Sequence, residues 1–346
     1  MPNLKRFAML AGLMIIVSLL LAACGAMPAT RQAAEANLSE QQIATLKSLK
    51  KVDDYPLYTM HYYGSSETSR VPPVSGQEFA SAHLPLTWAC SLFVAMGDAS
   101  KFYGRNFDWD FSPALLLFTH PPQGYASVSM VDMVYLGVGD TARTLTELPL
   151  DQRQALLRAP ALPFDGMNER GLVVGMAAVP SGDMQPDPDK ETIDSLMVIR
   201  KMLDQAGTVD EALAILQHYN IDWGRGPSLH YLIADRSGRA VLAEFYQGKL
   251  RLISNDKAWH LATNFLRSSV GASAEGHCPR YDQIDRQLSI AEGKLNSQEA
   301  TSLLGKVSQP STQWSIVYGM STGDIRVAMG RQYGRAYTFH IALTSE

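Results

Sequence analysis

The sequence predicts an α+β protein in which β-sheets are covered by helices. Residues 91–107 have the composition of a β-hairpin, and residues 171–179 form a nearly continuous apolar run, as in a strand buried on both faces. A helical block at 195–219 precedes further strands at 229–254, and more helices follow at 281–307. Strands and helices that occur in blocks favour packed sheets with outer helices over a doubly wound fold.

The composition is that of an ordinary globular chain, with 346 residues of which 46% are hydrophobic. This length allows two domains or one large sandwich. The formal net charge of -4 and the absence of a Lys/Arg run after the first residues argue against nucleic acid as a partner. No Cys-x-x-Cys or paired histidine motif indicates a metal site, and we predict no cofactor.

The hairpin is predicted to bring three chemically active side chains together. Its two strands flank a Gly-Asp-Ala-Ser turn at 97–100. Cys90 stands at the start of the first strand, and Arg105 and Asp108 stand at the end of the second. Because a hairpin brings its two ends together, we expect a thiol, a permanent cation and a carboxylate to lie close to one another.

This group of residues has a chemical use if the chain is cleaved between Ala89 and Cys90. Cys90 then carries a thiol nucleophile and a free α-amine, and the amine can act as general base for its own side chain. The unperturbed pKa values, about 8 for the amine and about 8.5 for the thiol, need only modest shifts. Asp108 could orient the ammonium form, and Arg105 could favour the thiolate. The alternative is an inert Cys90 buried on a strand.

Cys90 followed by Gly104-Arg105-Asn106-Phe107-Asp108-Trp109 resembles a known family. It is similar to the linear amide hydrolases with an N-terminal nucleophile, which include choloylglycine hydrolase, penicillin V acylase, acid ceramidase and isopenicillin N acyltransferase. The resemblance implies a four-layer αββα sandwich of the Ntn-hydrolase type, with Cys90 at the edge of one sheet. It also implies that autocatalytic cleavage exposes Cys90, that Arg105 is the adjacent cation and that Asp108 is the partner of the α-amine.

Further blocks resemble the family in the same order along the chain. Residues 165–172 resemble a turn that leads into the next strand, and residues 313–324 resemble a C-terminal hairpin. In Thr263-Asn264-Phe265, the resemblance makes Asn264 a donor of the oxyanion hole. In Pro279-Arg280-Tyr281, it makes Arg280 an active-site residue. From the residues alone, Arg280 could equally be a surface arginine that opens a helix.

One position departs from the pattern of bile salt hydrolases. These enzymes carry an Asn two residues before a Pro that follows the 165–172 block, whereas this chain has Ala178 before Pro180. One side-chain contribution to substrate or oxyanion binding is therefore missing. This argues against a close bile salt hydrolase and leaves Asn264 and a backbone N–H as the expected oxyanion donors.

Residues 1–24 are predicted to be a signal peptide of the lipoprotein type. Lys5 and Arg6 form a short positive region, residues 7–21 form the apolar region, and Leu-Ala-Ala precedes Cys24. This pattern resembles the bacterial lipobox, in which Cys24 becomes the lipidated N-terminus. We expect a lipid-anchored lipoprotein on a membrane of the bacterial cell envelope, outside the cytoplasm. An ordinary secretory signal and an uncleaved anchor are the alternatives.

Residues 25–89 are predicted to be a linker and a pro-segment, ahead of a catalytic domain at 90–346. An Ala-rich stretch at 25–37 is typical of a linker. Ser39 with Gln42 forms a capping-box pattern for a short amphipathic helix, and residues 55–63 are typical of a strand. This arrangement is similar to the small α-subunit of acid ceramidase. We therefore expect the two fragments to stay together through packing and strand pairing; an uncleaved chain is the alternative.

The remaining elements follow from local patterns. Thr208 and Glu211 form a capping box that begins the second helix of the helical block. The other predicted strands and helices are a strand at 125–138, a short helical patch at 151–158, helices at 195–206, 209–219, 281–291 and 297–307, and strands at 229–234, 241–246, 250–254, 316–318, 325–328 and 337–343.

Several other functions compete with an amidase. A disulfide between Cys90 and Cys278 would consume the nucleophile. A conventional Cys-His protease would use one of the scattered histidines, which are His230, His260 and His277. A non-catalytic ligand-binding lipoprotein would keep the fold but remain unprocessed. An acyltransferase would deliver the acyl group of the thioester to an amine in place of water.

The predicted substrate is a small linear N-acyl amide with a hydrophobic acyl group. Apolar residues surround the proposed site in sequence, although core packing explains most of them equally well. They are Trp88, Phe93, Phe107, Trp109, Phe111 and residues 115–118. The sequence leaves the acyl and amine parts open.

Overall fold

The computed structural model describes residues 38–64, 89–138, 142–224, 226–271 and 273–344. The predicted signal peptide, Cys24, the linker at 25–37 and Trp88 lie outside the described residues. Within the described ranges, no helix is long and apolar enough to cross a membrane.

The larger of two main sheets has nine strands in the order β1-β2-β5-β6-β7-β8-β11-β12-β13. All pairs are antiparallel except β2 with β5, which is parallel. The strands are β1 (Lys50–Asp53), β2 (Leu57–Tyr62), β5 (Ala114–Thr119), β6 (Ser127–Asp132), β7 (Asp165–Asn168), β8 (Val173–Val179), β11 (Ser228–Ala234), β12 (Ala240–Tyr246) and β13 (Lys249–Ser254).

The second sheet has six antiparallel strands in the order β14-β3-β4-β15-β16-β17. They are β3 (Ala89–Ala95), β4 (Phe102–Asp108), β14 (Trp259–Ala262), β15 (Thr312–Gly319), β16 (Asp324–Met329) and β17 (Ala336–His340). A separate parallel pair consists of β9 (Thr192–Asp194) and β10 (Asn220–Asp222). The hairpin predicted around the 97–100 turn is confirmed as β3 and β4, with Cys90 opposite Phe107.

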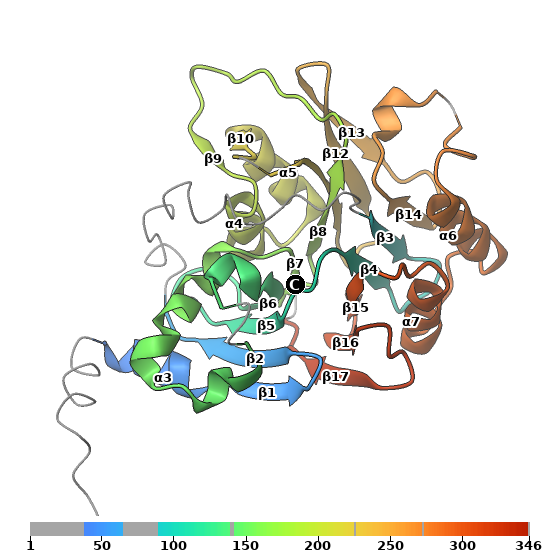
Figure 1. Ribbon diagram of the computed structural model, residues 1–346. Helices are drawn as coiled ribbons and strands as arrows, with labels where there is room; N and C mark the ends of the chain where they lie inside the picture. Colours follow the sequence, from blue (N-terminus) through green and yellow to red (C-terminus); the bar gives the residue numbers. More distant parts are fainter. Residues whose placement is uncertain (1–37, 65–88, 139–141, 225, 272, 345–346) are drawn as a thin grey trace, which may run out of the picture.

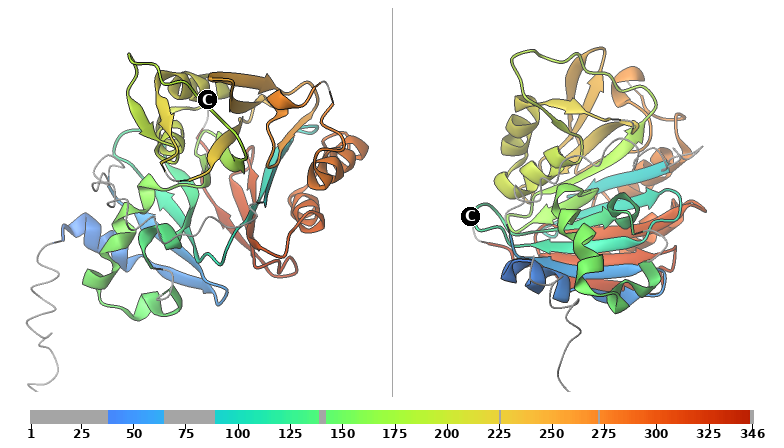
Figure 2. Two further views of the ribbon diagram at one scale, coloured as in Figure 1. Left: turned by 45° about the horizontal axis from the view of Figure 1, so that its top comes forward. Right: turned by 60° about the vertical axis from the view of Figure 1, so that its left-hand side comes forward.

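Helices cover the outer faces of both sheets (Figures 1 and 2). On the nine-stranded sheet, α4 contacts β7 and β8, and α5 contacts β11; on the six-stranded sheet, α6 and α7 contact β3, β4, β14 and β15. The α-helices are α3 (Glu40–Lys47), α4 (Met197–Gln205), α5 (Val209–His218), α6 (Pro279–Ile290) and α7 (Ser297–Lys306). The 3₁₀ helices are η3 (Met133–Leu136), η4 (Ala142–Glu147), η5 (Leu150–Ala161) and η6 (Arg267–Ser269).

The two sheets face each other through a buried core, and this confirms the predicted four-layer αββα sandwich. Strand β3 contacts β8 and β11 across the interface. The Tyr103 hydroxyl on β4 donates to the Leu232 carbonyl on β11 at 3.0 Å. Gly175 on β8 has no room for a side chain, since a Cβ there would lie 2.6 Å from the Tyr103 hydroxyl. The close approach of the sheets places the Cys90 end of β3 against β8.

Two strands that precede Cys90 in the chain, β1 and β2, are part of the larger sheet. Helix α3 begins at the predicted Ser39 capping box. Strand β2 pairs with β5 over its whole length, and its side chains Leu57, Tyr58 and Met60 are fully buried. Helix α3 packs on η5, which follows Cys90 in the chain. This segment is therefore integrated in the sheet and the core.

One predicted strand is shorter than its sequence pattern suggests. Residues 125–138 were expected to be extended throughout, but β6 ends at Asp132 and η3 follows. The Asp132 side chain accepts a hydrogen bond from the Val134 N–H and so caps the 3₁₀ turn, which ends at Gly137 with φ of 75°. The side-chain cap at Asp132 therefore ends the strand, although the residues that follow are apolar. Strands β1, β5, β9, β10 and β14 were not predicted from the sequence. The turn expected at 165–172 is also shorter, because residues 165–168 pair with β6 and β8 and form β7.

Candidate active site

Cys90 is the second residue of β3 and is 2% exposed. Its neighbour Ala89 pairs with Asp108 on β4, so the predicted cleavage site and the predicted carboxylate lie on adjacent strands. Burial raises the pKa of the Cys90 thiol, although the guanidinium of Arg105 opposes this effect. The thiol is therefore protonated at neutral pH and needs a base to become a nucleophile.

Arg105 is completely buried between the two sheets. Its guanidinium forms an ion pair with Asp165 on β7, and its Nε donates to the Met176 carbonyl at 3.2 Å. The Tyr318 hydroxyl also donates to Asp165, at 2.5 Å. Much of the Arg105 charge is thus neutralised by a carboxylate, so its support for a Cys90 thiolate is weaker than the sequence suggested.

Asp165 is a site residue that the sequence analysis missed. The sequence placed it only at the start of a turn-forming block, and nothing local identifies its partner. One feature could have identified Asp165: it is a carboxylate on a strand that is buried throughout. An unpaired charge is not tolerated there, so Asp165 requires a cationic partner.

Asp108 has one carboxylate oxygen without a partner. Its Oδ1 accepts from the Thr312 hydroxyl at 2.5 Å, whereas its Oδ2 is buried and accepts no hydrogen bond. Burial raises the Asp108 pKa to about 6. In the intact chain, the Cys90 N–H donates to Asn264 and not to Asp108. The predicted pairing of Asp108 with a free α-amine therefore stays a prediction about the cleaved protein.

Replacing Asp108 by Asn in an intact Cys90→Ala chain should change how stability depends on pH. The unfolded carboxyl group loses its proton near its ordinary pKa of 3.8, but the folded group keeps it until about 6. The folded state binds more protons in this window, so its free energy of unfolding falls as pH rises from 4 to 6, by about 3 kcal/mol. Asn does not titrate, so the Asp108→Asn chain should gain this amount relative to its parent and hold it at higher pH.

Urea unfolding of the Asp108→Asn chain and its Cys90→Ala parent from pH 4 to pH 8 measures this difference. A difference that stays constant across the window would contradict the prediction.

Asn264 and Arg280 converge on the backbone of Cys90. Asn264 lies two residues after the end of β14, and its Oδ1 accepts from the Cys90 N–H at 2.6 Å. Arg280, in the first turn of α6, donates to the Cys90 carbonyl, to the Ser91 hydroxyl at 2.9 Å and to Asn264 Oδ1 at 2.9 Å. The surface alternative for Arg280 does not hold, because this half-buried side chain binds the first residues of β3.

The Asn264 side chain is also tied to the other sheet. Its Nδ2 donates one hydrogen to the Ala178 carbonyl on β8 at 2.8 Å. A second Nδ2 hydrogen remains for an oxyanion. Ala178 has no polar side chain, but its backbone carbonyl orients the amide that is expected to stabilise charge. At Ala178, where bile salt hydrolases carry an Asn, this chain therefore contributes a backbone carbonyl in place of a side-chain amide.

Within the described residues, the structure supports neither a Cys90–Cys278 disulfide nor a Cys-His protease. Cys90 and Cys278 are both free thiols. His230 Nδ1 lies 3.2 Å from Glu244, and His260 Nε2 lies 2.9 Å from the Ile253 carbonyl. His277 stacks on Phe265. The predicted histidines are thus engaged with other groups than the Cys90 thiol.

The apolar residues expected around the site divide between three separate core clusters. Phe107 belongs to the same core cluster as Cys90 and stacks on Trp109 and Trp314. Phe93 points to the opposite side, into the core below α6 and α7. Leu115 and Leu117 pack against α3 and η5. Because strand side chains alternate in direction, only part of the list can line a site at Cys90.

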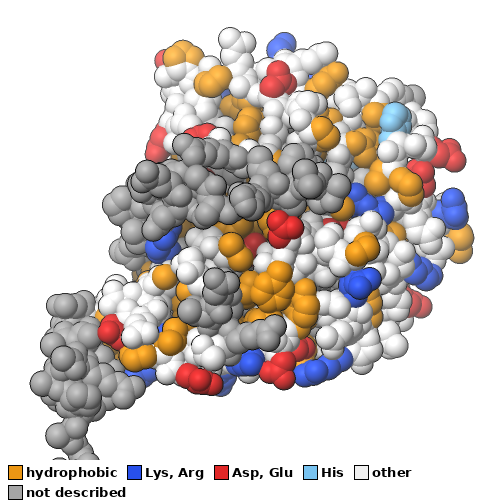
Figure 3. Space-filling model, viewed as in Figure 1, with side chains coloured by type: hydrophobic (Ala, Val, Ile, Leu, Met, Phe, Trp, Pro, Cys, Tyr) orange, Lys and Arg blue, Asp and Glu red, His pale blue; other side chains and the backbone are white. Residues whose placement is uncertain are grey.

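Aromatic side chains also reach the surface near the end of β4. Phe111 is 49% exposed and packs edge-on against Tyr55. In Figure 3, hydrophobic side chains gather in the middle of the face shown. Such a surface is compatible with an apolar ligand.

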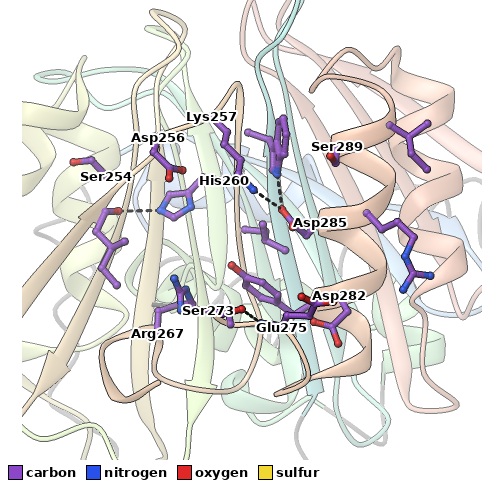
Figure 4. Close-up of a pocket in the computed structure, with 17 residues that line it drawn as sticks. Ser254, Asp256, Lys257, His260, Arg267, Ser273, Glu275, Asp282, Asp285 and Ser289 are labelled. Carbon is purple, nitrogen blue, oxygen red and sulfur yellow. Dashed lines mark hydrogen bonds and ion pairs between the residues drawn. The ribbon is translucent and has the colours of Figure 1, made fainter. Parts of the chain in front are cut away.

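A pocket of about 660 Å³ lies outside the group of residues around Cys90. It is bounded by β13, β14 and α6, and its lining includes Arg267, Glu275 and Asp285 (Figure 4). Cys90, Asn264 and Arg280 are not among its lining residues. The described residues contain no group of three or more His, Cys, Asp or Glu that could hold a metal ion.

The fold and this convergence of residues have counterparts among known proteins. Residues 90–268 match the linear amide C–N hydrolases, choloylglycine hydrolase family. The chain belongs to this family. Membership makes the protein a hydrolase of carbon–nitrogen bonds other than peptide bonds in linear amides.

Two solved structures of this kind share the fold. A mutant of conjugated bile acid hydrolase from Clostridium perfringens aligns with a TM-score of 0.51 and 16% identity, over 73% of this chain and 92% of that chain. Penicillin V acylase from Agrobacterium tumefaciens aligns with a TM-score of 0.51 and 16% identity, over 73% of this chain and 86% of that chain. These similarities confirm the Ntn-hydrolase fold of this choloylglycine hydrolase family member.

Proposed function

We propose that the protein is an amidohydrolase that cleaves linear N-acyl amides through a thioester on Cys90, after autocatalytic cleavage between Ala89 and Cys90. One observation carries the proposal: Asn264 and Arg280 bind the backbone N–H and C=O of a buried cysteine. Side chains that hold backbone atoms suit a nucleophile whose own amine is a reactant. The family match, which begins at residue 90, supports the same role.

In the proposed reaction, the Cys90 α-amine takes the thiol proton as the sulfur attacks the acyl carbonyl carbon. Asn264 Nδ2 and a backbone N–H stabilise the oxyanion. The resulting ammonium group gives its proton to the leaving nitrogen as the C–N bond breaks, which leaves a thioester. Water then attacks the thioester while the amine accepts one of its protons. The C–S bond breaks, the ammonium returns this proton to the departing sulfur, and the acid and the Cys90 thiol are released.

Asp108 and Arg105 have supporting roles in this proposal. The Asp108 Oδ2 has no partner in the intact chain and is available to accept from the ammonium group that cleavage creates. Arg105 carries a positive charge close to the thiol, and its effect is to favour the thiolate. Its ion pair with Asp165 fixes that charge between the two sheets.

We propose that residues 25–89 stay bound after cleavage. Pairing of β2 with β5 and the burial of α3 against η5 support this, because both contacts join residues on opposite sides of the cleaved bond. We also propose that Cys24 is lipidated and holds the enzyme on a membrane of the bacterial envelope. The lipobox-like sequence supports this location.

A hydrophobic acyl group is the proposed substrate feature. The support is the aromatic stack of Phe107, Trp109 and Trp314 in the core cluster that contains Cys90. Burial of an acyl chain against such rings is favourable by about 0.8 kcal/mol for each CH₂ group.

Hydrolysis of the aminomethylcoumarin amide of dodecanoic acid tests the proposal. The wild-type protein should release aminomethylcoumarin and free dodecanoic acid in equal amounts, and the matched Cys278→Ala variant should do the same. Recovery of the acyl group on an added primary amine, with little free acid, would indicate an acyltransferase. No product, together with equally slow alkylation of Cys90 and Cys278 by iodoacetamide, would indicate a non-catalytic binding lipoprotein.

A further inference from the structure

Residues 265–279, of which the structure describes 265–271 and 273–279, join the two side chains that hold the Cys90 backbone. The segment starts directly after Asn264 and ends directly before Arg280. One side of it borders the 660 Å³ pocket, to which Arg267 contributes (Figure 4). The pocket leaves that side of the segment without a packed neighbour, and a shift of the segment would displace the Asn264 amide. A reaction that depends on this amide needs the segment to be fixed by other contacts.

Glu244 supplies such a contact from the middle of β12. Its side chain is completely buried. Its Oε1 accepts from the Arg267 N–H and its Oε2 from the Ser268 N–H, both at 2.8 Å. These two N–H groups open the 3₁₀ helix η6, where they have no partner within the helix. Hydrogen bonds from backbone N–H groups to a carboxylate are among the stronger ones in proteins.

His230 on the neighbouring strand β11 holds the same carboxylate. Its Nδ1 lies 3.2 Å from Glu244 Oε1, and both side chains are buried. An ionised carboxylate can only accept, so Nδ1 is the donor. Burial acts to raise the Glu244 pKa, but hydrogen bonds from His230 and Ser268 lower it overall. The carboxylate is therefore ionised at neutral pH, and it connects the segment to two adjacent strands near the β13 edge of the larger sheet.

We propose that Glu244 is a positioning residue for the amidase reaction, because it fastens residues 267–268 to the nine-stranded sheet and thereby sets the place of Asn264 beside Cys90. The proposal rests on the proposed function of that site. Glu244 acts through Asn264, which is itself fixed to the Ala178 carbonyl of the same sheet. The two attachments to one sheet, three residues apart, define the direction of the Asn264 amide.

Glu244→Gln tests the role with little change in volume. The Gln amide nitrogen faces one of the two N–H donors, so one hydrogen bond is lost. We expect kcat for the dodecanoyl coumarin amide to fall by about 10- to 100-fold with KM changed less than about threefold, since misplacement of a catalytic group affects the transition state most. The matched control is Asp235→Asn. Asp235 is also buried and binds the Val209 N–H, at the far end of β11, and this variant should keep wild-type kcat.

A double-mutant cycle separates positioning from general destabilisation. If Glu244 acts through Asn264, the Glu244→Gln/Asn264→Ala protein should be no slower than Asn264→Ala alone. If the fold-losses in kcat of the two single variants multiply in the double variant, the two residues act independently and the proposal is overturned. Should Glu244→Gln fail to fold, His230→Leu removes one donor and leaves both backbone contacts. It should lower kcat several-fold in the same cycle, and an unchanged kcat would overturn the proposal.

Deuterium exchange provides a measurement that does not depend on the amidase activity. In an intact Cys90→Ala chain, the amide of residue 90 is expected to be protected by Asn264 Oδ1. Glu244→Gln should accelerate exchange of this amide at least about tenfold, and Asp235→Asn should not. Unchanged exchange would overturn the positioning role even if the enzyme is active. Accelerated exchange in a protein whose wild type hydrolyses no amide would instead count against the proposed function alone.

Discussion

Replacing Cys90 by Ala is expected to leave one intact chain with no amidase activity. The substitution removes the sulfur that is proposed to attack both the Ala89 carbonyl and the substrate. The other thiol of the described residues, Cys278, takes no part in the hydrogen bonds around the backbone of Cys90 and is not expected to replace it. Loss of the side chain changes little in the backbone contacts. The N–H and C=O of residue 90 keep their partners Asn264 and Arg280. A folded protein without activity is therefore the expected result.

Intact-mass measurement of wild type beside Cys90→Ala checks this first. The wild type should yield a fragment that begins at Cys90 and a noncovalent partner that ends at Ala89, and the variant should yield neither. Cys278→Ala is the matched control and should be cleaved like wild type. A cleaved Cys90→Ala chain would rule out autocatalysis. A wild-type disulfide between Cys90 and Cys278 would remove the proposed nucleophile.

Asn264→Ala is expected to produce the second-largest effect, a loss of about 10² to 10³ in kcat, or about 3–4 kcal/mol of transition-state stabilisation. The variant removes an Nδ2 hydrogen that can bind the oxyanion. It also removes the Oδ1 that accepts from both the Cys90 nitrogen and Arg280. The loss should therefore extend to the cleavage of the Ala89–Cys90 bond, which we expect to slow as well.

Steady-state kinetics of the processed protein and the time course of cleavage measure these two losses. Asn255→Ala is a suitable control, since Asn255 also uses its side chain to hold backbone groups, the Ala240 N–H and the Lys257 carbonyl. That variant should lose stability and keep kcat. An Asn264→Ala enzyme within about threefold of wild type would show that the oxyanion is stabilised elsewhere.

Much of the secondary structure could be predicted from local patterns. The capping boxes at Ser39 and Thr208 begin α3 and α5 as expected. The Gly-Asp-Ala-Ser turn joins β3 to β4, and its register places Ala89 opposite Asp108. These features depend on residues close together in the sequence, where spacing reports geometry directly. The family resemblance added Asn264 and Arg280, which no local pattern connects to Cys90.

The interior partners could not be predicted in the same way. The apolar residues near Cys90 in the sequence were expected to line a single substrate site. Because side chains alternate along a strand, Phe93 and Leu115 instead lie in two other core clusters. Arg105 looked like a free cation, yet Asp165 neutralises it from the other sheet. Glu244 had no visible role, because its partners Arg267 and Ser268 meet it only through folding.

The sequence by itself determined the family, the nucleophile candidate, the β3–β4 hairpin and most of the helices, since these follow from motifs and from short-range periodicity. Only the tertiary structure decided which charges are paired, which side of each strand faces Cys90 and what holds the segment between Asn264 and Arg280. The physical reason is that a buried polar group must find its partner across the sheets, and such partners lie far apart in the chain.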